Sequence, residues 1–207
     1  IKQWIYIAND SQKTPLVGHL LKEQTFNKVV VFCSSKLAVK QLTRELKRLR
    51  LSADEIHSDL DQEKREEVLM QFRSGKLHML VATDILSRGI DIDDIDLVIN
   101  YDVPHDGEDY VHRIGRTARA ESDGTAYTLV SPREYRKMLS IERLIGQEVP
   151  RGELPASIGP APELPKPGEG SNGRNRNNRG RQPNRPQRND RSRSNGGANR
   201  PSQSRPS

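Results

Sequence analysis

The 207-residue sequence contains one cysteine, few aromatic residues and no long apolar run. The single Cys33 excludes an intramolecular disulfide framework and is compatible with a reducing compartment, so we expect a cytoplasmic protein. No stretch approaches the roughly 18 consecutive apolar residues that span a bilayer, so we expect no membrane partner. The first residue is Ile1 rather than Met, and we therefore expect a piece of a longer protein.

Aromatic residues are absent after position 150, and charge is distributed just as unevenly. Residues 1–150 carry 22 Lys and Arg against 24 Asp and Glu, whereas residues 151–207 carry 12 against 4. A segment rich in Arg, Asn, Gly, Pro and Ser, without aromatics, cannot bury enough apolar surface to offset the entropy of ordering. We therefore predict one folded domain over 1–149 and a disordered basic tail over 150–207.

Short apolar runs alternate with amphipathic stretches through the first 150 residues. They predict strands at 4–8, 28–33, 53–57, 78–83, 96–102 and 125–130. They predict helices at 36–50, at 61–72, across 111–119 and from near Pro132. This alternation indicates an α/β fold with a mostly parallel central sheet flanked by helices. Ligands of such sheets bind at loops outside the carboxyl ends of the strands.

The stretch VATDILSRGID, at 81–91, follows one of these strands. Gly89 permits close approach of the backbone to a ligand, and Thr83 and Arg88 can contact phosphate oxygens. Asp91 could accept hydrogen bonds from a ribose. The alternative is a simple capped turn, in which Asp84 caps a helix and Asp91 only begins a loop.

The stretch VHRIGRTAR, at 111–119, places Arg113, Arg116 and Arg119 three residues apart. Arginines this close repel one another, so an anion is expected among them. On a helix or helix-like turn they would lie along one side, where they could neutralise the charge of a transferring phosphoryl group. The alternative is a solvated basic face paired with Glu108 or Glu121.

A third stretch, HSDLDQEKR at 57–65, has His57 after a predicted strand, with Gln62 and Arg65 on the following helix. Read alone, it is a packed histidine and a solvated helix start, with Asp61 as the N-cap and Gly75 as the stop. Its value lies in its combination with the other two stretches.

Together these stretches resemble the C-terminal RecA-like domain of DEAD-box RNA helicases, in particular the bacterial RhlE-like group. VVFCSSK at 30–36 resembles motif IV, and HSDLDQEKR resembles the segment H-G-x-x-x-Q-x-x-R. VATDILSRGID resembles motif V, and YVHRIGRTAR resembles motif VI, H-R-I-G-R-T-G-R. The resemblance covers about residues 1–145. Two positions depart from it, since Ala118 replaces the second glycine of motif VI and Ser58 replaces the glycine after His57.

The resemblance implies a role for each matching residue. The implied catalytic residues are Arg116, Arg119 and His112, and the implied nucleotide-binding residues are Asp91, Gly89 and Arg113. Arg116 and Arg119 would reach the γ-phosphate of ATP as arginine fingers, and Asp91 would contact the ribose. His112 would connect the nucleotide to the acidic box of the other domain, and Arg113 would help to hold motif VI in place.

The resemblance also implies an RNA surface made of Thr83, Arg88, Ser34, Ser35, Ser58, Gln62 and Arg65. Contacts to the sugar-phosphate backbone carry no base sequence, so unwinding should be largely sequence-independent. The tail has ten arginines and one acidic residue over 171–207, which suits non-specific RNA capture. The alternative for the tail is a solubilising linker. RNA is therefore an expected partner, and ribonucleoprotein or RNA-decay partners are compatible with it.

A phosphate-binding loop is missing from the sequence. No stretch fits G-x-x-x-x-G-K-S/T, because Gly75 and Lys76 are followed by Leu77 and Met70 stands at the first glycine position. DEIH at 54–57 only superficially resembles a Mg²⁺-binding box, since LSA rather than an apolar strand precedes it. We expect no metal ligands here.

The missing loop and Mg²⁺ ligands would come from the N-terminal RecA-like domain of the same protein. ATP and RNA would bind between the two domains, and the chain alone would be inactive as an ATPase. The alternative class is a non-catalytic RNA-binding module with a degenerate RecA-like domain and a basic tail. Retention of Arg116, Arg119 and Asp91 favours the enzyme.

Overall fold

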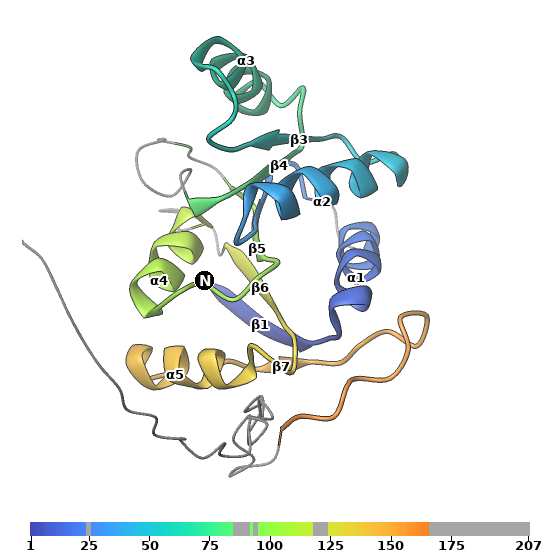
Figure 1. Cartoon of the computed structure of the whole chain (residues 1–207), viewed down its shortest axis with the longest axis vertical. Coiled ribbons are helices and arrows are strands. Elements are labelled where there is room, and N and C mark those ends of the chain that lie inside the picture. The colour runs from blue at the N-terminus through green and yellow to red at the C-terminus, as the bar shows by residue number, and fades with distance from the viewer. Residues whose placement is uncertain (24–25, 85–91, 93–94, 118–123, 166–207) are drawn as a thin grey trace, which may run out of the picture. The chain divides into compact units, whose positions relative to one another are not determined.

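The computed structural model describes residues 1–23, 26–84, 92, 95–117 and 124–165 (Figure 1). Its strands are β1 (Lys2–Ile7), β2 (Val29–Phe32), β3 (Ala53–Ile56), β4 (Met79–Ala82), β5 (Leu97–Asn100), β6 (Thr125–Val130) and β7 (Arg151–Gly152). Its helices are α1 (Asp10–Glu23), α2 (Lys36–Arg48), α3 (Gln62–Arg73), α4 (Gly107–Ile114), the 3-10 turn η2 (Gly115–Thr117) and α5 (Tyr135–Ile145). The predicted residues Arg88, Gly89, Asp91 and Arg119, and the segment 166–207, lie outside the described residues.

The described strands form one sheet in the order β3-β4-β2-β5-β6-β1-β7, and every pairing among them is parallel. The α/β fold with a parallel central sheet is therefore confirmed. In the register, Phe32 of β2 pairs with Ala82 of β4 and Asn100 of β5, and Ile56 of β3 pairs with Ala82. Four strands thus end at one level, and the loops that follow them leave from one edge.

Helices cover both faces of the sheet, because successive strand residues point to opposite sides. Val29 and Val31 of β2 pack in one core cluster with apolar residues of α1 and α2. Val30 and Phe32 pack in a second cluster with α3. A third cluster joins β1 and β6 to α4 and α5. In Figure 1, α1 and α2 accordingly lie together on one side, away from α4 and α5.

The predicted helix at 61–72 lies at Gln62–Arg73, and both of its predicted end signals are confirmed. Asp61 Oδ1 accepts a hydrogen bond from Lys64 N at 2.7 Å, which makes it the N-cap. Gly75 adopts φ +76, a conformation that favours glycine. Among the described residues no helix is both long and apolar enough to cross a bilayer.

Two parts of the structure lie outside the predicted elements. Helix α1 was not predicted, because it contains Pro15 and its apolar residues are interrupted by polar ones. After residue 149 the chain adds β7 to the sheet and packs Leu154 and Ile158 on the first core cluster. Gln12 Nε2 donates to Ile158 O at 3.2 Å, and the described residues up to 165 belong to the first compact unit. The predicted boundary at 149 therefore falls before the last strand.

Candidate functional site

Arg113 ties α4 to the carboxyl edge of the sheet. Its side chain is buried, and its Nε donates to Asp84 Oδ1 at 2.7 Å. Its Nη1 donates to Asn100 Oδ1 at 3.2 Å, and the guanidinium lies over the Phe32 ring at 5.1 Å. Asn100 is itself fixed, since its Nδ2 donates to Thr128 Oγ1 at 3.1 Å. One cation therefore joins the ends of β4, β5 and β2 to α4.

These contacts bear on two expectations about the arginines. Arg113 was predicted among the nucleotide-binding residues and as a group that holds motif VI in place; its guanidinium is enclosed by protein partners, as the second of these roles requires. The arginines were expected along one side of a helix or helix-like turn; Arg113 lies on α4, Arg116 lies on the 3-10 turn η2 that follows it, and Arg119 lies outside the described residues. Arg113 consequently points into the core, whereas Arg116 is half-buried at the surface. Asp84, the alternative helix cap, pairs with Arg113.

Helix α4 presents His112 outward for local reasons. Asp106 is the N-cap, and its Oδ1 accepts from Asp109 N at 2.9 Å. Tyr110 and Ile114 are buried in the third core cluster, and the Tyr110 hydroxyl donates to Gln3 Oε1 at 2.7 Å. With these residues facing inward, His112 is exposed in the last turn.

The turn that carries Arg116 is closed by Thr117. The buried Thr117 hydroxyl donates to Ile114 O at 2.9 Å. Gly124 lies directly against this turn, because a Cβ at that position would come within 2.0 Å of Thr117 O and 2.3 Å of Thr117 Cβ. The position of Arg116 therefore depends on the close approach of a glycine backbone.

The predicted RNA residues Ser34 and Ser35 lie in the turn between β2 and α2, and both are exposed. Ser35 Oγ accepts from Ala38 N at 3.2 Å and caps α2. Ser34 N donates to Asp102 Oδ2 at 2.7 Å. This turn has exposed side chains and a fixed backbone, as a surface for phosphate contacts requires.

Ser58 is exposed in the turn that follows β3. The buried His57 holds this turn, since its Nδ1 accepts from Asp59 N at 3.2 Å. Asp59 accepts from Lys36 Nζ at 2.8 Å and from Lys40 Nζ at 3.0 Å. Hydrogen bonds from Lys36 and then from Lys40 lower the pKa of Asp59 to about 2. The turn of Ser58 is therefore joined to α2, beside the turn of Ser34.

The other predicted RNA residues are placed differently. Gln62 is exposed on α3 and donates to Glu66 Oε1 at 2.7 Å. The Nε atom of the half-buried Arg65 and the Oγ1 atom of Thr83 are buried, and neither has a hydrogen-bond partner within the described ranges. The Thr83 hydroxyl points inward, so its predicted RNA contact requires a rotation of the side chain.

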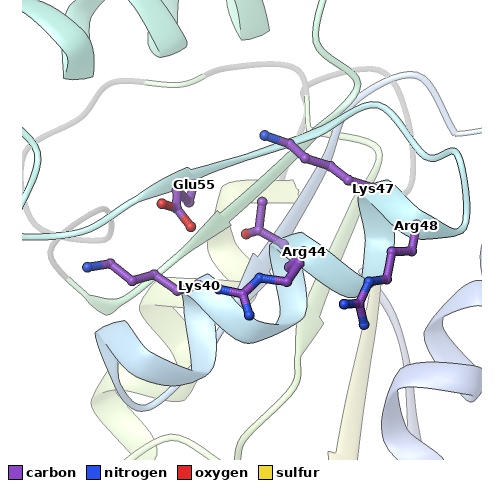
Figure 2. Close-up of a pocket in the computed structure, with 6 residues that line it drawn as sticks. Lys40, Arg44, Lys47, Arg48 and Glu55 are labelled. Atoms are coloured by element: carbon purple, nitrogen blue, oxygen red, sulfur yellow. The ribbon is translucent and has the colours of Figure 1, made fainter.

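A groove of about 530 Å³ lies beside α2. It is lined by Lys40, Thr43, Arg44, Lys47, Arg48 and Glu55. Figure 2 shows four of these cations along α2, with Glu55 on the neighbouring strand. Three of the cations have acidic partners, in the pairs Lys40–Asp59, Lys47–Asp54 and Arg48–Glu45. These pairs leave little net charge, so the groove is a solvated helix face.

A buried polar cluster at the same carboxyl edge was not found from the sequence. Lys13 Nζ lies 2.7 Å from Glu134 Oε2 and 3.7 Å from Asp102 Oδ1, with a side chain 2% exposed. Glu134 also accepts from Val103 N at 2.9 Å and Ser131 N at 3.1 Å. Burial opposes its ionisation, but the Lys13 charge and these donors outweigh burial, so the pKa of Glu134 lies below its usual value. One member of this cluster could have been found from the sequence, because Asp102 ends a predicted strand and ligands of such sheets bind at the ends of strands.

Arg113→Ala is expected to lower the free energy of unfolding by about 2 kcal/mol. Removal of one partner of a buried pair costs about 3–5 kcal/mol, and the 38% exposure of the Asp84 side chain reduces the loss. Urea denaturation of the chain measures it. Arg44→Ala, at an exposed position of α2, is the matched control and should change stability by less than about 0.5 kcal/mol. Equal stability of the two variants would contradict the role of Arg113.

Within the described part of the chain, no group of three or more His, Cys, Asp or Glu side chains is arranged to hold a metal ion. The site offers a half-buried arginine, an exposed histidine and exposed serines, all at the carboxyl edge of one sheet. Such a set can contact phosphate groups.

Known proteins are similar to this chain in sequence. The family model for the helicase conserved C-terminal domain matches residues 12–121. The ATP-dependent RNA helicase RhlB of Xanthomonas axonopodis pv. citri (strain 306) is 38% identical over 173 residues, which are 82% of this chain and 30% of that protein. The ATP-dependent RNA helicase DbpA of Bacillus subtilis (strain 168) is 39% identical over 166 residues, which are 80% of this chain and 35% of that protein. The chain spans about a third of the length of these relatives.

A solved structure has the same fold as this chain. The E. coli DEAD-box protein SrmB, bound to regulator of ribonuclease activity A, superposes with a TM-score of 0.74 at 35% identity. The match covers 81% of this chain and 98% of that chain. The RecA-like fold is thereby confirmed, and the narrower assignment to the RhlE-like group stays a prediction. The chain belongs to the helicase conserved C-terminal domain family, in its DEAD-box branch.

Proposed function

We propose that this chain is the C-terminal half of an ATP-dependent RNA helicase, which unwinds or remodels short RNA duplexes when two RecA-like domains close on single-stranded RNA. The placement of α4 and η2 carries the proposal. Arg113 is fixed inside the domain, while His112 is exposed and Arg116 is half-buried at the carboxyl edge. The relatives RhlB and DbpA are ATP-dependent RNA helicases, which supports the same function.

The chain fits one side of a nucleotide. The guanidinium of Arg116 suits phosphate oxygens and the charge that develops during phosphoryl transfer. His112 would bond to the acidic box of the N-terminal domain, which would also supply the phosphate loop and hold Mg²⁺. ATP would supply the phosphoanhydride bond whose hydrolysis allows the closed domains to reopen. Arg119, Asp91 and Gly89 are proposed beside Arg116 on sequence grounds.

The RNA strand would lie over the turns that follow β2 and β3. Ser34, Ser35 and Ser58 are exposed there, and their hydroxyls can bond to phosphates and sugars. Gln62 and Arg65 on α3 would support that surface. Because these groups read no base edges, we expect unwinding that depends little on sequence.

The proposed partners are RNA and the N-terminal RecA-like domain of the same protein, and ribonucleoprotein or RNA-decay proteins are compatible further partners. We propose a cytoplasmic location, since the single cysteine, Cys33, is compatible with a reducing compartment.

Separation of a short labelled RNA duplex tests the proposed function. The chain joined to a DEAD-box N-terminal RecA-like domain should separate the strands only when ATP is present. The joined Arg44→Ala variant, altered at an exposed position of α2, should do so at an unchanged rate. Tight RNA binding without ATP-dependent separation would instead support the non-catalytic RNA-binding module.

Deletion of residues 170–207 is expected to weaken RNA affinity and to flatten its dependence on salt, because the deletion removes ten arginines. The cut belongs after Glu169, since β7 and residues 153–165 are part of the first compact unit. Fluorescence anisotropy between 50 and 200 mM salt, in the range where such contacts lose roughly 10³-fold or more in affinity, measures both effects. An unchanged affinity and salt slope would show that the tail is only a linker.

A further inference from the structure

Asp102 touches two functional parts of the site at once. It follows β5, and its Oδ2 accepts a hydrogen bond from Ser34 N at 2.7 Å. Its main-chain oxygen accepts from Arg113 Nη1 at 3.3 Å. Ser34 lies in the proposed RNA turn, and Arg113 fixes the helix of His112. A single residue therefore joins the RNA side of the domain to its nucleotide side.

The residues around Asp102 are also fixed by hydrogen bonds and ion pairs. Tyr101 N donates to Phe32 O at 2.9 Å, which extends the pairing of β5 with β2 up to the two loops. Lys13 Nζ lies 3.7 Å from Asp102 Oδ1 and is fixed by Glu134 at 2.7 Å. Because Lys13 is buried, its charge fixes the carboxylate on one side while Ser34 N occupies the other.

The negative charge of the Asp102 carboxylate strengthens its interactions with the Ser34 amide and with Lys13. The Ser34 amide lies beyond the end of β2, and a charged acceptor bonds such an amide more strongly than a neutral one. Asparagine in its place keeps an acceptor oxygen but loses the attraction to Lys13. Alanine would leave both the Ser34 amide and the Lys13 charge without this acceptor, although Glu134 still neutralises Lys13.

We propose that Asp102 is a positioning residue that transmits RNA contact at the Ser34 turn to the orientation of α4 and η2. RNA phosphates that bind at the Ser34 turn displace the Ser34 amide. This displacement shifts the Asp102 carboxylate, which accepts the hydrogen bond of that amide. The hydrogen bond between the Asp102 main-chain oxygen and Arg113 then changes, and the positions of His112 and Arg116 change with it. The proposal rests on the proposed function, since it assigns RNA to the Ser34 turn.

One experiment uses the joined two-domain protein. The ratio of ATP hydrolysis at saturating oligouridylate to hydrolysis without RNA should fall about tenfold in Asp102→Asn, the usual size of coupling between two sites. The fall should be larger in Asp102→Ala. Asp54→Asn, at an aspartate that also pairs with a lysine but lies away from the edge, is the matched control and should keep the ratio. An unchanged ratio in Asp102→Asn would overturn the proposal, even if hydrolysis fell by the same factor with and without RNA.

A second readout needs no ATPase activity, and separates the two proposals. In amide NMR spectra of the chain, oligouridylate should shift the Ser34 and α4 amides together in the wild type. In Asp102→Asn it should shift the Ser34 amide alone, with the dispersion of the spectrum preserved. If α4 responds equally in both proteins, Asp102 does not transmit the contact. A joined wild-type protein without ATP hydrolysis would count against the proposed function only, and the NMR comparison would still decide the role of Asp102.

Discussion

Arg116→Ala is expected to lower the RNA-stimulated ATP hydrolysis of the joined protein about a thousandfold, the lower end of the contribution of an arginine finger. The structure gives Arg116 a fixed base, because Thr117 closes the turn and Arg113 fixes the preceding helix. The loss should fall on the turnover rate and leave RNA affinity nearly unchanged, since the finger acts on charge that develops during phosphoryl transfer.

Two further variants sharpen this result. Arg116→Lys keeps a charge but loses the planar fork, so it should recover only part of the activity. Arg44→Ala should match the wild type, because Arg44 is an exposed arginine on α2. Activity of Arg116→Ala within about twofold of the wild type would remove Arg116 from the proposed role and leave Arg119 as the candidate.

Gly124→Ala is expected to destabilise the chain by more than about 3 kcal/mol, or to prevent folding. The added Cβ would lie 2.0 Å from Thr117 O, and this is a backbone atom that cannot rotate away. The strand β6 or the turn η2 must therefore shift, and both are paired or buried. Urea denaturation of the chain measures the loss in free energy of unfolding.

Gly115→Ala is the matched control for Gly124→Ala. Gly115 begins the same turn, a Cβ there meets no atom within 4 Å, and its φ of −58 is acceptable to alanine. The free energy of unfolding of Gly115→Ala should stay within about 0.5 kcal/mol of the wild-type value. Comparable losses in the two variants would contradict the close approach of Gly124 to the Thr117 turn.

The sequence predicted best the elements whose apolar pattern is strong. VVVF of β2 and MLVA of β4 are fully buried runs, as expected for parallel strands covered on both faces. Helix α3 carried its own end signals in Asp61 and Gly75. Helix α1 was missed because Pro15 suggests a break, although the structure tolerates it. Helix α5 was expected from near Pro132 but begins at Tyr135, since Glu134 bonds to Ser131 and Val103 before the helix starts.

The candidate site was predicted as a set of residues and not as a geometry. The motif pattern singled out Arg113, but could not show that its partners are Asp84, 29 residues earlier, and Asn100. Burial of the Thr83 hydroxyl was equally invisible, because it depends on neighbours brought together by the sheet. Asp102 and Lys13 belong to no motif used in the prediction, and only folding brings Asp102 beside Ser34 and Lys13 beside Asp102.

ATP hydrolysis by separate and joined halves tests the central claim most directly. The chain alone should not hydrolyse ATP, because it has no phosphate-binding loop. Joined to a DEAD-box N-terminal RecA-like domain, it should hydrolyse ATP at a rate that rises with single-stranded RNA and depends on Arg116. A joined protein that is folded and binds RNA, yet shows no RNA-stimulated hydrolysis, would contradict the claim that this chain forms half of a helicase site.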